Sequence, residues 1–346
     1  MNANLKYVQL YDILRQQILQ EAYKFGQQLP TEFEMSDRYG VSRQTVRSAL
    51  KKLETDGYIS RKQGSGSYVS YHHVPSKRKK RIAVIATYIS EYIFPSILRG
   101  IEEISSQNSC SIQISATNNS LLTERRVLSS ILADPLDGII AEGTKTTLPN
   151  PNLESYRKLA DAGIPIVFFN SYYSELEHPN VKYVVTDDYA GSVQAVKMLI
   201  EKGHTMIGGI FKSDDIQGLK RFSGFIDGCI QYGACLDEKN IIWYTTESKH
   251  TFLIDDSSAT NNVLGSCTAI VCYNDEIASQ LITMIEEHKS AVKAIVSFDR
   301  NIKIHNNDID FYSFEHPKAE LGRIAMKKLL RMLEGEEESS SVLPWG

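Results

Sequence analysis

The chain has 346 residues, of which 42% are hydrophobic and 23% are charged, and its net charge at pH 7 is -4. This length predicts two domains or more, and the composition is that of a globular protein rather than of a disordered or membrane-embedded one. The sequence has no apolar run long enough to cross a membrane, and its first residues lack the apolar segment of an export signal. We therefore expect a cytoplasmic protein whose five scattered cysteines stay reduced and which binds no metal or cofactor.

The charge is divided unevenly along the chain. Residues 1–81 hold 15 Lys and Arg against 7 Asp and Glu, a net of +8, and the remaining residues carry a net of -12. This asymmetry predicts a module that binds a polyanion joined to a module with another task. Residues 72–81 contain a proline and five consecutive Lys or Arg, which is typical of a solvated linker. We therefore predict domains at residues 1–71 and 82–346.

The first domain contains the signals of two short helices followed by a hairpin. Thr31 can cap a helix that ends at Gly40, and Ser42 can cap a second helix that ends at Gly57. Four apolar residues of the second helix recur on one helical face: Val46, Ala49, Leu50 and Leu53. Two helices joined by a glycine-containing turn predict a helix-turn-helix, and residues 58–70, YISRKQGSGSYVS, predict a β-hairpin wing. The fold class expected here is a small α+β winged helix-turn-helix.

The opposite face of the second helix carries Arg43, Gln44, Arg47 and Lys51. Arginine can make two hydrogen bonds to guanine, and glutamine can do the same to adenine. The first turns of such a helix enter the major groove, and glycines at a hairpin tip let the backbone approach a phosphate closely. A solvated helix would explain any one of these arginines, but the cap, turn, basic face and glycine wing together favour DNA binding.

The string PTEFEMSDRYGVSRQTVRSALKKLETDGYISRKQGSGSYV resembles the winged helix-turn-helix of the GntR family over its full length. The resemblance implies that a homodimer binds double-stranded operator DNA. The residues that it implies in DNA contact are Lys6, Glu32, Ser42, Arg43, Gln44, Thr45, Arg47, Gln63, Gly64 and Gly66. Two interpretations of Glu32 stay open: it accepts from a cytosine amine, or it only balances the positive end of its helix.

After Arg81, short apolar runs alternate with helical segments. The predicted strands are 82–87, 111–117, 137–143, 165–170, 182–188, 205–211, 241–246, 268–274 and 293–299. The predicted helices lie near 95–107, 121–133, 153–162, 189–202, 216–232 and 275–288. This alternation predicts an α/β domain of parallel sheets covered by helices. We expect two doubly wound lobes that bind a ligand beyond the carboxyl ends of their strands.

Several strings of this second domain, among them TYISEYIFPSILRGIE, GIFKSDDIQGLKRFSGF and CYNDEIA, resemble the LacI-type, periplasmic-binding-protein-like domain of bacterial arabinose repressors of the GntR family. Planar polar groups and aromatic faces at the predicted strand ends suit a sugar. The candidate sugar-binding residues are Tyr88, Glu91, Tyr92, Phe94, Glu142, Asn170, Arg221, Asn274, Asp299 and His316. The resemblance points to Arg221, Asn274, Asp299 and His316 as the set that binds hydroxyls.

Structural interpretations compete with ligand binding at two of these positions and at the neighbouring Asp275. Asp275 is better explained as the cap of the next helix than as a ligand-binding residue. Tyr88 is equally well explained by packing, and His316 taken alone would be a structural histidine. The expected function is a repressor released from its operator by L-arabinose. The alternatives are a regulator that answers another pentose or related small polar ligand, and a pyridoxal-phosphate enzyme, for which the sequence offers no lysine context or other catalytic motif.

Three segments depart from the resemblance. The connection within 285–299 is shorter than the loop that LacI-type domains carry there, and residues 300–310, RNIKIHNNDID, lack the usual serine- or glycine-rich continuation. The last residues, SSSVLPWG, resemble the start of a final strand beyond which the family continues. Either the chain is truncated or its last crossover is trimmed, and the role of Asp299 and the completeness of the second lobe depend on which holds.

Overall fold

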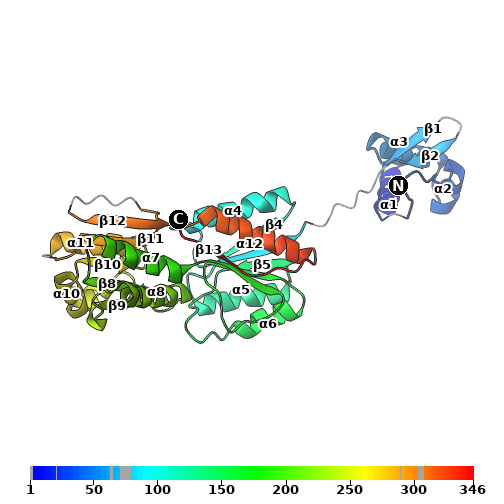
Figure 1. Ribbon diagram of the computed structural model, residues 1–346. Coiled ribbons are helices and arrows are strands. Elements are labelled where there is room, and N and C mark those ends of the chain that lie inside the picture. The colour runs from blue at the N-terminus through cyan, green and yellow to red at the C-terminus, as the bar shows by residue number, and fades with distance from the viewer. Residues whose placement is uncertain (1–2, 21, 63–64, 71–78, 289, 303–307) are drawn as a thin grey trace. The chain divides into compact units, whose positions relative to one another are not determined.

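The computed structural model describes residues 3–20, 22–62, 65–70, 79–288, 290–302 and 308–346. The chain divides into two compact units, Met1–Lys79 and Lys80–Gly346, whose elements are labelled in Figure 1. All five cysteines are free thiols. Within the described residues, no helix is long and apolar enough to cross a membrane, and no group of side chains could hold a metal ion.

The first unit, here called the head, is a winged helix-turn-helix. Its elements are α1 (Ala3–Leu19), α2 (Glu32–Tyr39), α3 (Arg43–Thr55), β1 (Ile59–Lys62) and β2 (Gly66–Val69). Thr31 caps α2, and the Glu34 carboxylate accepts from the Thr31 backbone N–H at 2.7 Å. Gly40 ends α2 at φ 60°, and Ser42 caps α3. The four apolar residues predicted on one face of α3 are buried in the core of the head.

The second unit, here called the body, consists of two lobes. In lobe 1, six strands of the described chain form a parallel sheet in the order β13-β7-β6-β5-β3-β4. These are β3 (Arg81–Ala86), β4 (Ser111–Ala116), β5 (Gly138–Ala141), β6 (Ile166–Phe169), β7 (Val181–Thr186) and β13 (Ser341–Leu343). One face packs on α4 (Phe94–Gln107) and α12 (Lys318–Leu333), and the other on α5 (Leu121–Ala133) and α6 (Leu153–Asp161).

In lobe 2, five described strands form a parallel sheet in the order β12-β11-β10-β8-β9. They are β8 (Ile207–Lys212), β9 (Ile241–Tyr244), β10 (Ala269–Cys272), β11 (Ala294–Asp299) and β12 (Asp310–Glu315). One face packs on α7 (Asp188–Glu201) and α8 (Ile216–Tyr232). The other packs on α9 (Phe252–Asp255), α10 (Ser257–Ser266) and α11 (Asp275–Glu287). A short 3₁₀ helix, η1 (Glu238–Asn240), precedes β9.

Every strand and helix predicted for the body lies within a few residues of an observed one in the described chain. Five further elements of the described chain were not predicted: β12, η1, α9, α10 and α12. Strand β12 escapes the pattern because it is an edge strand, with polar or charged residues at both ends and no fully buried residue. Helix α10, SSATNNVLGS, escapes because most of its residues are polar, and only Thr260, Val263 and Leu264 are buried.

Three segments of the described chain cross between the lobes. They are the step from β7 to α7, the step from β12 to α12, and the residues after β13. In the third, the Gly346 N–H donates to the Glu315 carbonyl at 3.0 Å, and the Glu315 N–H donates back at 2.9 Å. The residues SSSVLPWG therefore supply both an edge strand of lobe 1 and a connection to lobe 2.

The close contact of α4 and α12 depends on two glycines. A Cβ on Gly322 would lie 2.2 Å from the Ile97 carbonyl oxygen, and one on Gly100 would lie 2.1 Å from the Ala319 carbonyl oxygen. We expect Gly322→Ala to lower the free energy of unfolding by about 1–3 kcal/mol, because the helices must separate. Gly265→Ala is the matched control, since a Cβ there meets nothing within 4 Å. Urea denaturation checks this, and equal midpoints for the two variants would contradict it.

Candidate ligand cavity and nucleic-acid interface

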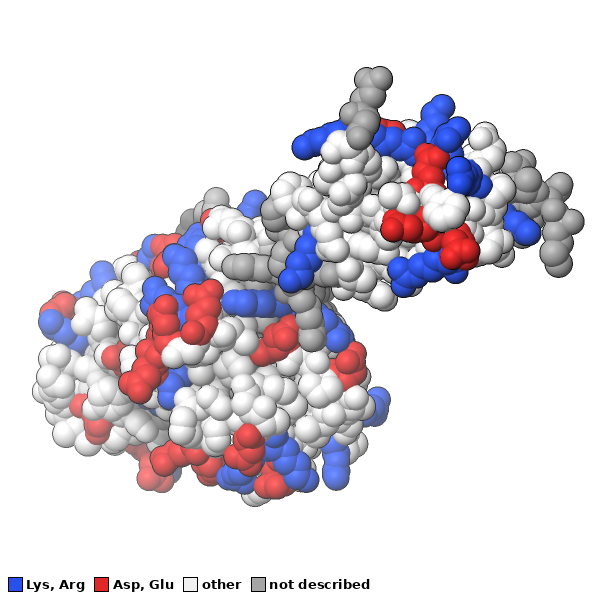
Figure 2. Space-filling view, turned by 90° about the vertical axis from the view of Figure 1, so that its right-hand side faces the viewer, with Lys and Arg blue, Asp and Glu red and all other residues white. Residues whose placement is uncertain are grey.

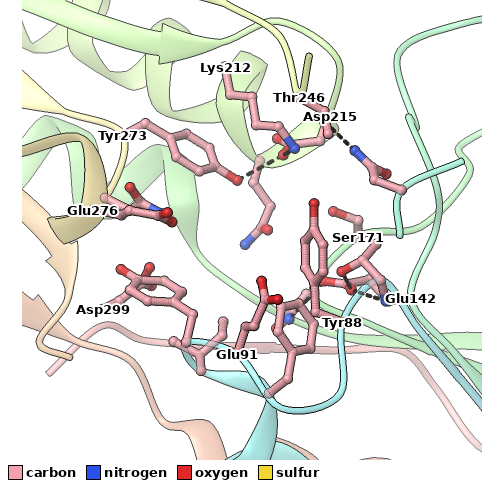
Figure 3. A pocket seen from close by; sticks show the side chains of 18 of the residues that line it. Tyr88, Glu91, Glu142, Ser171, Lys212, Asp215, Thr246, Tyr273, Glu276 and Asp299 are labelled. Carbon is pink, nitrogen blue, oxygen red and sulfur yellow. Dashed lines mark hydrogen bonds and ion pairs between the residues drawn. The ribbon is translucent and has the colours of Figure 1, made fainter. Parts of the chain in front are cut away.

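A cavity of about 490 Å³ lies between the lobes, where side chains from the strand ends of both sheets meet (Figure 3). Its volume falls in the range of small-molecule sites. Nine of the ten candidate sugar-binding residues line it: Tyr88, Glu91, Tyr92, Phe94, Glu142, Asn170, Arg221, Asn274 and Asp299. His316 is not among the lining residues.

Arg221 is the charged centre of the lobe 2 wall. It lies on α8 and is 1% exposed. Its Nε and Nη2 each lie 2.9 Å from the Asp188 Oδ1, and its Nη1 donates to the Tyr273 carbonyl. Burial alone would lower the pKa of Arg221, but Asp188, Tyr273 and Asp299 raise it above its ordinary value. The guanidinium is therefore a fixed cation, and the N–H groups not used by these partners are available to a ligand.

Asp299 ends β11 and faces the same cavity (Figure 3). Burial raises the pKa of its carboxyl to about 6, although Arg221 and Tyr92 pull it down. Its backbone has a positive φ of 97°, and three other lining residues also have positive φ: Tyr92 at 54°, Asn119 at 51° and Asn170 at 55°. Non-glycine residues held at positive φ cluster at ligand sites, where the surrounding structure holds them in place.

Glu142 organises the lobe 1 wall. Its carboxylate accepts from the Thr87 backbone N–H and the Asn170 Nδ2, both at 3.0 Å, and from the Thr87 hydroxyl. Burial raises the pKa of Glu142, and these hydrogen bonds partly lower it. Within the described structure, the Asn170 Oδ1 is buried without a partner. Because Glu142 fixes the amide, this oxygen can accept from a ligand hydroxyl.

Sequence reasoning missed several polar residues of the lobe 2 wall. Asp215 caps α8 and accepts from the Lys212 Nζ at 2.9 Å and the Tyr273 hydroxyl at 2.8 Å. Burial opposes the charge on Lys212, but Asp215 and then Asp214 raise its pKa above the ordinary value. The signal was present, because GIFKSDDIQGLK puts Lys212 and Asp215 directly after a predicted strand. Other lining residues missed are Thr87, Ser171, Thr246, Lys249, Tyr273 and Glu276.

The expected cap of α11 was wrong. Asn274, not Asp275, is the cap, and its Oδ1 accepts from a backbone N–H in the first turn at 3.1 Å. Asp275 is fully buried and accepts from the Ser313 hydroxyl at 2.6 Å and the Asn301 N–H at 2.7 Å. Its carboxylate therefore ties the start of α11 to β12 and to the segment after β11. Asn274 lines the cavity, but its side-chain oxygen is already engaged.

His316 lies behind the cavity wall. It is 3% exposed, and its ring meets the Trp345 ring edge-on at 5.3 Å. Burial, with a smaller effect of Arg221, lowers the pKa of His316 to about 3, so the ring is neutral. Neither ring nitrogen has a partner among the described residues. Tyr88 is both packed and lining: it meets Phe94 edge-on at 5.7 Å and borders the cavity.

The lobes touch at the rim of the cavity. Two side-chain pairs join them: Asn119 with Thr246, and Lys145 with Glu247. In addition, the Thr146 hydroxyl accepts from the Ile216 N–H, and the Thr147 hydroxyl donates to the Ser213 carbonyl. In each pair the first residue belongs to lobe 1 and the second to lobe 2. These contacts bridge the two lobes at the rim of the cavity.

In the head, the predicted base-reading side chains lie on the exposed surface of α3 and at the start of α2. Arg43 and Gln44 are exposed, and the Arg43 guanidinium lies 4.9 Å above the Phe33 ring. Arg47 Nη2 pairs with the Glu32 Oε2 at 2.9 Å. Two predicted base readers thus engage each other here, and each must exchange its partner to reach a base.

The remaining predicted DNA contacts include two residues with structural roles, Ser42 and Gly66, and one residue on α1, Lys6. The Ser42 hydroxyl caps α3 by accepting from the Thr45 N–H at 3.2 Å. Gly66 has φ 114°, and a Cβ there would lie 2.6 Å from the Gln28 side chain, so the wing requires glycine. Lys6 is exposed on α1. Gln63 and Gly64 lie outside the described residues. Figure 2 shows Lys and Arg around the edges of the visible face of the head with Asp and Glu between them, and mixed charges over the visible face of the body.

Comparison with known proteins identifies both units. Residues 6–69 match the family described as bacterial regulatory proteins, gntR family, and residues 82–337 match the periplasmic binding protein domain. The arabinose metabolism transcriptional repressor of Halalkalibacterium halodurans is 37% identical over 96% of this chain and 91% of its own length. The chain belongs to the GntR-type repressors with a periplasmic-binding-protein domain. The repressor of the same name from Geobacillus stearothermophilus is 35% identical to this GntR-type repressor, over 95% of this chain and 91% of its own.

A solved structure agrees on the fold. Transcription regulator CcpA of Lactococcus lactis covers 78% of this GntR-type repressor and 97% of its own chain, with a TM-score of 0.64 and 21% identity. The predicted fold class is therefore confirmed. The prediction of a DNA-binding repressor rather than an enzyme is also confirmed, because the relatives and similar structures are transcriptional regulators.

Proposed function

We propose that this GntR-type repressor binds operator DNA as a homodimer in the cytoplasm and releases it when L-arabinose fills the cavity. The observation that carries the proposal is the convergence of Arg221 and Asp299 on one cavity at the strand ends. A fork of donors beside a carboxylate suits neighbouring sugar hydroxyls, which both donate and accept. The choice of sugar is supported by the names of the two relatives, both repressors of arabinose metabolism.

The charges of the cavity favour a neutral ligand. Among the described lining residues, the acids are Glu91, Glu142, Asp215, Glu276 and Asp299, and the bases are Lys212, Arg221 and Lys249. All three bases are already paired: Lys212 with Asp215, Lys249 with Glu276, and Arg221 with Asp188. A phosphorylated sugar or a sugar acid would add negative charge to a site in which acids outnumber bases. This supports a neutral polyhydroxy compound as the effector.

Release follows from linkage. A sugar that weakens operator binding must bind the DNA-free protein more tightly than the DNA-bound protein, by the same factor. A homodimer would present two heads to two half-sites, so its operator should be an inverted repeat. Closure of the lobes over the sugar is the step that we propose to bias this equilibrium.

A panel of aldoses, followed by unfolding temperature, tests the choice of effector. A ligand at 100 times its Kd stabilises the folded protein by about 2.7 kcal/mol. L-arabinose should give the largest shift, and a larger shift with another pentose would assign that sugar instead. The second step measures affinity for an operator selected from random DNA. Equal operator affinity with and without saturating sugar would overturn the proposed release.

Sugar binding should depend on pH through Asp299. The carboxyl pKa is about 6 in the closed cavity, and a protonated Asp299 loses one of its acceptors. We therefore expect affinity for the sugar to rise with pH up to about 6 and to level off above about 7. The same raised pKa makes the folded protein lose stability as pH rises from the ordinary Asp value toward 6.

Calorimetric titrations of the sugar between pH 5 and pH 8 check this expectation. Asp299→Asn is the control, because it cannot ionise and its affinity should show no rise near pH 6. A wild-type affinity that stays constant over the whole range would contradict a role for the ionised carboxylate.

A further inference from the structure

Trp345 lies against the guanidinium of Arg221 but does not line the cavity. The Arg221 Cζ is 5.0 Å from the Trp345 ring centroid, 4.5 Å from that of Phe298 and 4.6 Å from that of Tyr273. The Trp345 and Phe298 rings meet edge-on, with centroids 5.0 Å apart. Arg221 is therefore held among three aromatic rings, and one of them belongs to the segment that follows β13.

Three contacts hold Trp345 in place. On one side, β13 pairs with β7, and the Asp187 N–H donates to the Leu343 carbonyl at 2.8 Å. On the other side, Gly346 exchanges two backbone hydrogen bonds with Glu315. Beneath the ring lies Gly191 of α7, where a Cβ would come within 2.7 Å of the Trp345 Cδ1. Backbone hydrogen bonds therefore fix the chain on both sides of Trp345, and the missing side chain of Gly191 leaves space for its ring.

The hydrogen bonds of Arg221 do not by themselves fix the tilt of its guanidinium plane. Asp188 holds the Nε and Nη2, and the Tyr273 carbonyl holds the Nη1. Both partners act in the plane of the guanidinium, because N–H bonds of an arginine point in that plane. The three rings add cation–π attraction and van der Waals contact, which act on the guanidinium besides these hydrogen bonds. Loss of one ring would let the plane tilt and misdirect the N–H groups that remain for a ligand.

We propose that Trp345 is a positioning residue for the effector: it holds the Arg221 guanidinium in the orientation that binds the sugar. The residue touches no ligand and acts only through Arg221. Because it stands on the third crossover, it also joins the sugar-binding arginine of lobe 2 to an edge strand of lobe 1. The inference rests on the proposed role of Arg221 in sugar binding.

Four forms of the full-length chain test the proposal: the wild type, Trp345→Leu, Trp345→Phe and Trp243→Leu. Phenylalanine keeps an aromatic face and leucine does not. Trp243 is the matched control, because it packs on Phe211 and Phe222 and lies outside the cavity lining. Titration with L-arabinose should give a Kd about tenfold higher for Trp345→Leu, in keeping with a cation–π contact, and a smaller rise for Trp345→Phe. Trp243→Leu should bind as the wild type does.

A second readout needs no sugar. The Nε–H resonance of Arg221 is assigned by its loss in Arg221→Lys and then compared among the four forms by NMR. It should move and broaden in Trp345→Leu, move less in Trp345→Phe and stay in place in Trp243→Leu. If Trp345→Leu does not fold, Gly191→Ala displaces the ring from below and should move the same resonance.

The outcomes separate the two proposals. An unchanged Arg221 resonance in Trp345→Leu, or an unchanged Kd for a sugar that the wild type binds, would overturn the positioning role. A wild type that binds no aldose would overturn the proposed function, and the resonance would still decide whether Trp345 orients Arg221. A general loss of stability would lower the unfolding temperature of Trp345→Phe and Trp345→Leu alike without moving the resonance, and that result also rejects the proposal.

Discussion

Replacing Arg221 with lysine is expected to abolish the response to sugar while leaving operator binding intact. Lysine keeps a positive charge near Asp188, so the buried carboxylate is not left alone. It lacks the planar fork, however, and cannot satisfy Asp188, the Tyr273 carbonyl and a ligand together. Sugar affinity should fall at least about a hundredfold, the loss that corresponds to two hydrogen bonds to a charged group.

Arg221→Ala should do more than remove binding. It leaves Asp188 buried without its partner, and breaking a buried ion pair in this way costs about 3–5 kcal/mol of stability. Calorimetry measures the binding, and urea denaturation separates it from stability. Arg323→Lys is the control, because that arginine forms its ion pairs on the surface of lobe 1. Sugar binding by Arg221→Lys at wild-type strength would refute the assignment of this residue.

Replacing Arg47 with alanine is expected to remove most of the discrimination between operator and other DNA. Each bidentate contact to a base is worth about 1–3 kcal/mol of discrimination, or roughly ten- to a hundredfold. Arg47 is exposed on α3 and pairs with Glu32 at 2.9 Å, a partner that it must exchange to reach a base. Lys52→Ala is the control on the same helix, since Lys52 pairs with Asp56. Fluorescence anisotropy with operator and scrambled DNA at matched salt measures both affinities.

Glu32→Gln distinguishes the two interpretations of that residue. If Glu32 reads a cytosine, the variant should bind scrambled DNA more tightly, because a negative charge is gone, and lose preference for the operator. If Glu32 only balances the end of α2, both affinities should rise together. Operator preference retained in full by Arg47→Ala would show that Arg47 does not read a base.

The head could be predicted closely because its signals are local. Thr31, Gly40 and Ser42 fix helix ends through bonds to residues only a few positions away, and such bonds are visible in the sequence. The pairing of Glu32 with Arg47 could not be predicted, because it depends on how α2 packs against α3. The exposed ring of Phe33 below Arg43 is a second contact of that kind.

In the body, the residues at strand ends could be predicted from the sequence, but the side chains that they contact could not. Asp299 ends a predicted strand, and parallel strands bring their carboxyl ends to one edge, whereas Arg221, on α8, was indicated by the resemblance to LacI-type domains. Asp275 was misassigned because an acidic residue at the start of a helix is usually a cap, whereas here it is buried beneath β12, a strand too polar to be recognised. His316 was placed in the site although its ring lies behind it, and Trp345 was overlooked because only the third crossover brings it to Arg221.

Strand β13 and helix α12 make the folding of lobe 1 depend on residues that are synthesised long after its first strand. Lobe 1 starts at β3, yet one face of its sheet is covered by α12, and its edge is closed by β13. At about 5–20 residues per second, the head leaves the ribosome on the order of tens of seconds before these elements do. A nascent chain therefore carries a complete head while the apolar face of the lobe 1 sheet that α12 will cover is still exposed to solvent. Lobe 1 cannot complete its core until α12 has been synthesised, and we expect the nascent chains that lack α12 to be the aggregation-prone species of this repressor.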